Sequence, residues 1–285
     1  MTSEKNEDVF SSLERSRKQT LNQSSFQFKE LDPSELEDYP AFLIGNDRPL
    51  NETELESFQM TSDFLLVGTS LFRSIDFACR LASTHKVNPK VIIVDNSRQV
   101  IDTWAKLKSF FEKTTETDAK KFLEDPDDGF LEFIFNELQD STMNANLRKG
   151  TLVSSVPYFR QFFRVYSVEQ VRSIILKAQV LRQDWGNDEL FNDIKRLYPD
   201  RPIVAYPSNI ISCCKQSDQC KVLKSISTLQ PSLCIFSNLD PDWRVPTMTY
   251  MLPKPTIVEI GNILKLEDSV VNPTEGNLGN SPQPK

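Results

Sequence analysis

Two short apolar runs in the first third of the chain each end on a residue that could contact a nucleotide. The run over residues 64–67 ends on Gly68, and the run over 91–94 ends on Asp95. A glycine at the end of a strand lets a ligand approach the backbone closely, and an aspartate there can accept hydrogen bonds from ribose hydroxyls. This spacing indicates the opening strand–helix–strand unit of a nucleotide-binding sheet.

Polar side chains also follow two later apolar runs. One run, over residues 178–181, ends close to Asp184, and the other lies within residues 201–210. Because ligands of open α/β sheets bind outside the carboxyl ends of the strands, all four strand ends are candidates for one site. The candidates are Gly68, Thr69, Ser70, Asp95, Asn96, Asp184 and Trp185 for binding a cofactor, and Tyr206, Ser208 and Asn209 for orienting a substrate.

The elements that must position these residues alternate along most of the chain. Continuous apolar runs are typical of strands buried on both faces, and helical periodicity separates them. Strands are expected over 64–67, 91–94, 178–181, within 201–210, and over 232–236, 247–252 and 256–260, with helices over 70–83, 97–111, 168–176, 190–197 and 222–229. Pro253 and Pro255 predict a tight antiparallel connection between the last two strands. The expected fold is α/β, a doubly wound, mostly parallel sheet that ends in an antiparallel hairpin.

Composition indicates a single domain with flexible ends. Residues 1–27 are rich in Ser, Glu, Lys and Asn and are expected to form a flexible arm, and 267–285 are expected to be a disordered tail. Residues 28–266 form the expected domain, in which 28–60 is a lead-in that packs against the sheet. The stretch 114–166 interrupts the alternation after the second strand–helix unit and is interpreted as a helical insertion or cap.

Charge and cysteine content argue against several classes of protein. A formal net charge of −7 argues against a nucleic-acid-binding face, and no apolar run is long enough to span a membrane. The chain opens with polar and acidic residues, without the pattern of a secretory signal. Five cysteines, an odd number in a long chain, are typical of reduced thiols, so a cytoplasmic location is expected.

Metal and histidine chemistry have little support in the sequence. Cys213, Cys214 and Cys220 cluster, but they form no Cys-x-x-Cys pair, and a structural zinc site needs four ligands at reachable spacing. The single histidine, His85, is expected in a surface loop before a strand. The sequence therefore predicts no metal site and offers no second histidine as a general base.

With its elements in this order, the chain resembles the class I S-adenosylmethionine-dependent methyltransferases, a Rossmann-like family. The resemblance covers residues 63–112 and 167–263. It implies S-adenosylmethionine as the cofactor and transfer of its methyl group to a small-molecule or protein acceptor that the sequence does not identify. Because the sulfonium is already activated, the protein of such an enzyme mainly aligns the acceptor.

The resemblance implies a role for each strand-end group. The loop of Gly68, Thr69 and Ser70 would pass under the methionine part of the cofactor. Asp95, followed by Asn96, would bind the ribose hydroxyls. The remaining roles fall to Asp184 on the adenine amino group, Trp185 on the adenine ring, and Tyr206, Ser208 and Asn209 beside the reactive methyl group.

The first loop departs from the family pattern acidic-x-Gly-x-Gly-x-Gly. Leu66 stands in the place of the acid, Ser70 and Phe72 stand in the places of the second and third glycines, and only Gly68 remains. A side chain at these places obstructs close approach to the backbone. A second hypothesis is therefore a cofactor-free interaction protein, or a bacterial effector delivered to a host cytosol, that binds a protein partner through the insertion.

Other interpretations also stay open. A nicotinamide-linked oxidoreductase shares the first two motifs, but the chain lacks a full Gly-x-Gly-x-x-Gly. Asp95 could instead cap the helix that follows it, and Asp184 with Trp185 could form a plain turn around a partly buried indole. In that case Gly68 would only terminate a strand.

Overall fold

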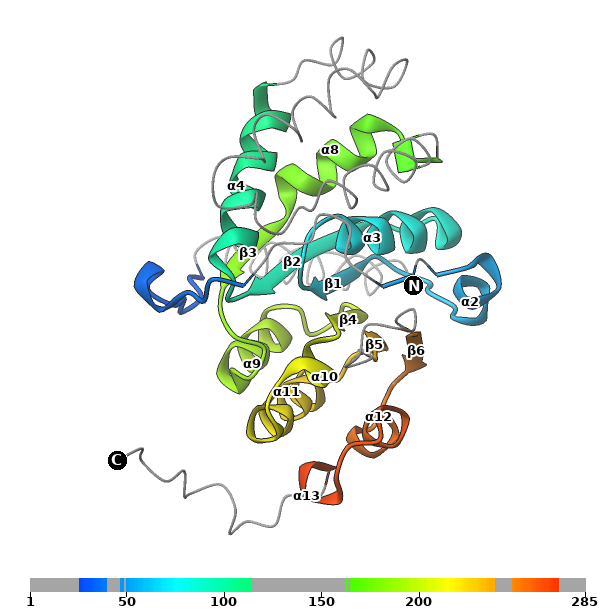
Figure 1. The fold of residues 1–285 in the computed structure, drawn as a ribbon. Coiled ribbons are helices and arrows are strands. Elements are labelled where there is room, and N and C mark those ends of the chain that lie inside the picture. The colour runs from blue at the N-terminus through cyan, green and yellow to red at the C-terminus, as the bar shows by residue number, and fades with distance from the viewer. Residues whose placement is uncertain are drawn as a thin grey trace, which may run out of the picture.

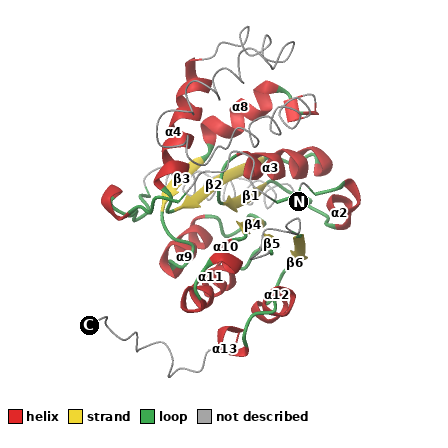
Figure 2. Ribbon diagram, in the orientation of Figure 1, coloured by secondary structure: helices red, strands yellow, loops and turns green. Residues whose placement is uncertain are grey.

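The computed structural model describes residues 26–39, 47–48, 50–113, 162–163, 165–238 and 248–271. Within these ranges the chain forms one six-stranded sheet with helices on both faces (Figures 1 and 2). The strands are β1 (Phe64–Gly68), β2 (Pro89–Asp95), β3 (Gln179–Arg182), β4 (Ile203–Ser208), β5 (Leu233–Ser237) and β6 (Thr249–Pro253). They lie in the order β3-β2-β1-β4-β5-β6, and all neighbours are parallel except the antiparallel pair β5 and β6. The predicted fold class is confirmed.

Helices cover the two faces of the sheet as two separate layers (Figure 2). One layer holds α3 (Phe72–His85), α4 (Arg98–Lys113) and α8 (Val168–Lys177), and the other holds α9 (Asp188–Leu197), α10 (Ile210–Cys213), α11 (Gln216–Leu229), α12 (Ile257–Leu264) and α13 (Asp268–Val271). The short helices η1 (Pro33–Glu35) and α2 (Glu52–Ser57) precede β1. In the described part of the chain, no helix has the length and apolarity needed to cross a membrane.

Strand β1 lies at the centre of the sheet and is buried on both faces. Leu66 packs into the layer of α3 and α8, while Leu65 and Val67 pack into the layer of α9 and α11. On one side β1 pairs with β2 and on the other with β4, so the strand order reverses between β1 and β4. This reversal is the point at which open α/β sheets form a crevice for ligands.

The predicted last strand, 256–260, is wrong because these residues begin helix α12. Thr256 Oγ1 accepts a hydrogen bond from the Glu259 amide at 3.2 Å, and Glu259 Oε2 accepts one from the Thr256 amide at 2.8 Å. Such a capping box fixes the start of a helix. The apolar side chains of Ile260 and Leu264 then face the core. The antiparallel partner of β6 is β5.

Two further predictions need correction, and one lies mostly outside the described residues. Residues 268–271, expected in a disordered tail, form α13, where Val270 is buried. His85 is the last residue of α3 rather than part of a loop, and its ring packs edge-on against Phe58 at 6.5 Å. Most of the predicted insertion, 114–161, lies outside the described residues.

Candidate functional site

The carboxyl ends of β1 and β2 bring the first two candidate groups together. Asp95 Oδ2 accepts hydrogen bonds from Thr69 Oγ1 at 2.5 Å and from the Ser70 amide at 3.1 Å. Its Oδ1 accepts a third bond, from the Ser97 amide at 2.9 Å. The carboxylate therefore holds the loop after β1 and the start of α4 in place, and most of its acceptor capacity is used by the chain itself.

In the loop after β1, a serine has a backbone conformation that usually requires glycine. Ser70 has φ of 64°, in the left-handed region that favours glycine. A Cβ atom added to Gly68 would lie 2.7 Å from Ser74 Oγ, so the chain's own hydroxyl fills the space beside this glycine. Ser74 Oγ donates to the Thr69 carbonyl at 2.5 Å. The group that approaches Gly68 closely is therefore the Ser74 side chain of α3.

Burial raises the pKa of Asp95 above its usual value. Desolvation of the carboxylate is the largest cause, and the hydrogen bonds from Thr69, Ser97 and Ser70 act in the opposite direction. The nearby charge of Asp184 raises the pKa further. A carboxylate in this environment depends on its donors to remain ionised, which makes those donors costly to displace.

The second pair of candidate groups lies at the ends of β2 and β3 and divides into an exposed part and a buried part. Asn96 Nδ2 donates to Asp184 Oδ2 at 3.1 Å, and Asp184 is exposed. Trp185 is 2 % exposed, its Nε1 donates to the Val94 carbonyl at 2.9 Å, and its ring contacts Phe191. The indole is therefore a core residue and is not available to pack on an adenine ring.

The third group, at the end of β4, turns inward rather than forming an exposed rim. Tyr206 is completely buried, and its ring packs edge-on against Phe77 at 4.8 Å. Its hydroxyl donates to Asp47 Oδ2, which also accepts from Ser208 Oγ at 2.6 Å. Asn209, which is partly exposed, begins α10 without a side-chain capping bond. Asn209 is the member of this group that is partly exposed, while Ser208 is only 7 % exposed and Tyr206 is buried completely.

Asp47 is the residue of this site that the sequence did not point to. It is 1 % exposed, and its Oδ1 has no hydrogen-bond partner among the described residues. Burial raises the pKa of Tyr206 well above its usual value, and the negative charge of Asp47 adds to this effect. Tyr206 is thus a fixed hydrogen-bond donor to Asp47 rather than a source of phenolate.

A buried ion cluster lies beneath the same strand ends, on the first turns of α3. Asp76 is fully buried and accepts from Arg73 Nη1 and from Arg80 Nε, both at 2.9 Å. The positive charge of Arg73 also acts on the Tyr206 phenol, where it opposes the effect of Asp47. The spacing of opposite charges at i, i+3 and i+4 in an otherwise apolar helix was the available sequence signal for this cluster.

The lead-in, predicted over 28–60, is described at residues 28–39, 47–48 and 50–60, and its first part covers this edge of the sheet. The Leu31 amide donates to the Arg182 carbonyl at 2.8 Å, and Arg182 forms an ion pair with Glu30. The Glu37 amide donates to the Asn96 carbonyl at 2.9 Å. In Figure 1 the dark-blue segment with η1 lies beside the ends of β2 and β3. The predicted packing of the lead-in against the sheet is confirmed for these residues.

The strand-end residues do not fit S-adenosylmethionine as they stand. A ribose at Asp95 would have to compete with Thr69 and the Ser70 amide, and the space beside Gly68 holds Ser74. Trp185 and Tyr206 are buried in the core. Phe72, in the place of the third glycine, is also buried, where it contacts Phe162. The exceptions are the exposed Asp184 and the partly exposed Asn96 and Asn209. Every other group that the resemblance assigns to the cofactor or to the reactive methyl group is occupied within the fold.

Cysteine and metal chemistry find no support at this edge. Burial raises the pKa of Cys214 to about 12, so its sulfur stays a thiol, which is a weak nucleophile. The five cysteines are free. In the ranges that the structure covers, no three His, Cys, Asp or Glu side chains come together as a metal site would require.

The chain has no match among the models of known protein families or the sequences of characterised proteins.

Proposed function

We propose that this chain is a methyltransferase-like protein that binds a protein partner and does not use S-adenosylmethionine. The observation that carries the proposal is the Asp95 carboxylate, whose two oxygens accept three hydrogen bonds from Thr69, Ser70 and Ser97. A ribose-binding acid must offer free acceptor positions to two hydroxyls, and here the chain's own donors use them.

The energetic balance supports the same proposal. Hydrogen bonds to a charged acceptor each contribute about 1.5–3 kcal/mol, so a ribose that displaced Thr69 and Ser70 would gain little net free energy. The same reasoning applies to the ribose of a nicotinamide cofactor. Methyl transfer and hydride transfer are therefore both disfavoured at this edge.

The proposed partner site is the insertion, which lies mostly outside the described residues. Its sequence carries apolar residues at helical spacing, at Phe130, Phe133, Ile134 and Leu138. We place this partner-binding role in the cytosol, because five free cysteines, an odd number, are typical of a protein with reduced thiols.

Titration calorimetry with S-adenosylmethionine and S-adenosylhomocysteine tests the first half of the proposal. No heat and no thermal shift are expected at millimolar ligand. Saturable binding that Asp95→Ala abolishes, and that the exposed Asp102→Ala on α4 leaves intact, would restore the methyltransferase hypothesis.

Affinity purification of the full chain tests the second half. A protein that co-purifies with the wild type should be lost from the double variant Phe130→Ser/Phe133→Ser, whose urea unfolding curve should match that of the wild type. A chain that remains monomeric and without partner, or a partner that both forms retain, would contradict the assigned partner site.

A further inference from the structure

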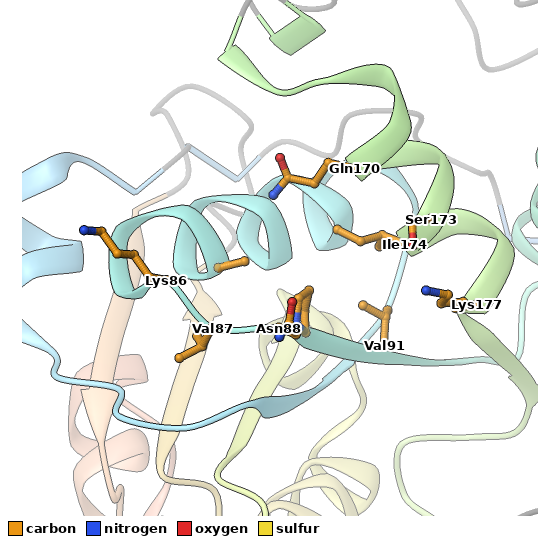
Figure 3. A pocket seen from close by; sticks show the side chains of 10 residues that line it. Lys86, Val87, Asn88, Val91, Gln170, Ser173, Ile174 and Lys177 are labelled. Carbon is orange, nitrogen blue, oxygen red and sulfur yellow. The ribbon is translucent and has the colours of Figure 1, made fainter. Parts of the chain in front are cut away.

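A cavity of about 390 Å³ opens at the amino edge of the sheet, opposite the candidate site. It lies between the end of α3, the start of β2 and the helix α8 (Figure 3). Its lining residues are Ala82, Lys86, Val87, Asn88, Pro89, Val91, Gln170, Ser173, Ile174 and Lys177. This volume lies within the range of about 300–1,000 Å³ that is typical of small-molecule sites.

The sequence keeps this space open where the two helices face each other. Ala82 on α3 and Ser173 on α8 are both small, so neither side chain fills the gap above the start of β2. Pro89, the first residue of β2, has no amide hydrogen to satisfy there. The cavity is thus bounded by regular elements on three sides rather than by loops alone.

The lining combines an apolar body with cationic and amide groups. Val87, Val91 and Ile174 supply the apolar wall, while Asn88, Gln170 and Ser173 offer polar groups. Lys86 and Lys177 are the charged lining residues, and no carboxylate lines the cavity in the part of the chain that is described. In Figure 3 the Lys177 ammonium points toward the cavity, whereas Lys86 points outward from the end of α3.

Both lysines have charge to offer to a ligand. Neither ammonium group pairs with a carboxylate of the described residues. Lys86 is the C-cap of α3, with φ of 56°, and Lys177 is the last residue of α8. The partial negative charge of a helix C-terminus stabilises the ammonium group of each lysine. The same partial charge repels a dianion more than a monoanion, so the cavity suits a ligand with one negative charge better than a phosphate group.

From the cavity and its lining we infer that the amino edge binds a small organic carboxylate with an apolar chain. The carboxylate lies at Lys177, with Ser173 as a further donor, because the backbone amide and Nδ2 of Asn88 already donate to Asp63 Oδ1 at 2.8 and 3.1 Å. The apolar chain lies against Val87, Val91 and Ile174. The site is independent of the proposed function, because none of its lining residues belongs to the carboxyl edge or to the lead-in.

Calorimetry on the full chain with octanoate as the probe tests this inference. Octanol and octylamine share its apolar body without the negative charge, and inorganic phosphate supplies negative charge without the apolar body. Saturable binding of octanoate with no heat from the other three is expected. Equal binding of octanol or octylamine, binding of phosphate instead, or no binding of octanoate would overturn the inference.

Single substitutions test which lysines of the cavity bind octanoate. Lys177→Gln should weaken octanoate binding about tenfold, and Lys86→Gln should weaken it by a smaller factor of about three. Lys265→Gln is the matched control, because Lys265 is also a left-handed C-cap, on α12, with φ of 53°. Octanoate binding that is equal in Lys177→Gln and Lys265→Gln would contradict the assignment.

A cavity-filling variant gives an independent readout. Ser173→Leu places a larger apolar side chain on α8 at the lining of the cavity, and it should abolish octanoate binding. Circular dichroism and urea unfolding verify that this variant is folded. If folded Ser173→Leu binds octanoate as the wild type does, the ligand lies elsewhere and the inference fails.

Discussion

The two edges of the sheet differ in whether their polar groups already bind other parts of the chain. At the carboxyl edge, Asp95, Tyr206 and Asp47 Oδ2 form hydrogen bonds with other parts of the chain, and the lead-in covers the strand ends. Asp47 Oδ1 is buried there without a partner among the described residues. At the amino edge, Lys86 and Lys177 line a cavity and pair with no described carboxylate. The location of a ligand site in this fold depends on which polar groups still have capacity to bind, and not on topology alone.

The largest expected effect comes from the ion cluster beneath the carboxyl edge. Asp76→Ala removes the carboxylate that accepts from Arg73, whose side chain is 5 % exposed, and from Arg80. We expect the free energy of unfolding to fall by about 3–5 kcal/mol, because breaking a buried ion pair is strongly destabilising. Urea denaturation measures the change.

An exposed pair of the same spacing is the control for this cluster. Asp193 and Arg196 on α9 also form an i, i+3 ion pair, with the arginine side chain 68 % exposed. Asp193→Ala should change the free energy of unfolding by less than about 0.5 kcal/mol. Similar small losses in both variants would mean that water reaches the Asp76 cluster and that this edge is not sealed.

The anchor of the lead-in should give the next largest effect. Asp47→Ala leaves the hydroxyls of Tyr206 and Ser208 without their acceptor, and we expect a loss of about 2–3 kcal/mol. Asp38→Ala removes the hydrogen bond of an exposed residue of the same segment with Gln99, and it should cost about 0.5 kcal/mol or less. If Asp47→Ala and Asp38→Ala have the same free energy of unfolding, the contacts of Asp47 do not hold the lead-in against the carboxyl edge.

The strand-end carboxylate should show a pH-dependent effect. The pKa of folded Asp95 is raised above 3.8, so its contribution to stability is greatest below that value and is lost as pH rises through the folded pKa. Thr69→Val removes a donor to the ionised form. The variant should lose about 1.5 kcal/mol at pH 7 and less at pH 4, as measured by urea denaturation.

A second buried threonine tests whether the pH dependence belongs to Asp95. Thr103 Oγ1 donates to the Gln99 carbonyl at 2.6 Å, a bond between neutral groups. Thr103→Val should therefore lose the same free energy at both pH values. A loss in Thr69→Val that does not change with pH would show that Asp95 keeps one protonation state across this range.

The smallest expected effect lies near the amino edge, at the single histidine. Burial lowers the pKa of His85 below 6.5, so its contribution to stability is present above pH 6.5 and is lost as pH falls through the folded pKa. The effect should remain below about 1 kcal/mol, because the ring is only partly buried. In untagged protein, one imidazole NMR signal should titrate below pH 6.5.

The ring contact of His85 with Phe58 offers a way to move this titration. Phe58→Ala removes the ring that packs edge-on against the imidazole and admits water. The midpoint should then rise toward 6.5. An unchanged midpoint would mean that the shift has another origin than the cover provided by Phe58.

The regular part of the fold could be predicted because its signals are local. Buried parallel strands are short continuous apolar runs, and β1, β2 and β5 lie within two residues of their predicted ends. Residues 256–260 begin a helix and not the predicted strand because the capping box of Thr256 and Glu259 outweighs their apolar content. That local signal was present in the sequence and indicates a helix.

The candidate site could be predicted only in part because its decisive contacts are not local. The position of the strand-end residues directly after apolar runs predicts that they lie together, and in the structure Thr69 does contact Asp95 and Asn96 does contact Asp184. Asp47, however, lies 159 residues from Tyr206. No local sequence pattern predicts a partner at this separation, so the contacts of Asp47 that close the crevice could not be predicted from the sequence.

The long separation between the lead-in and its contacts also sets an order of events during synthesis. Asp47 and Ser208 are 161 residues apart, and Glu30 and Arg182 are 152 apart. At about 5–20 residues per second, a ribosome needs roughly 8–30 s to travel from one to the other. During that interval the lead-in can meet only its earlier partners, such as Asn96, whose carbonyl accepts from the Glu37 amide, and its contacts with β3 and β4 cannot form. The closure of this edge is therefore completed only after β4 has been made, and until then its strand ends are open to chaperones.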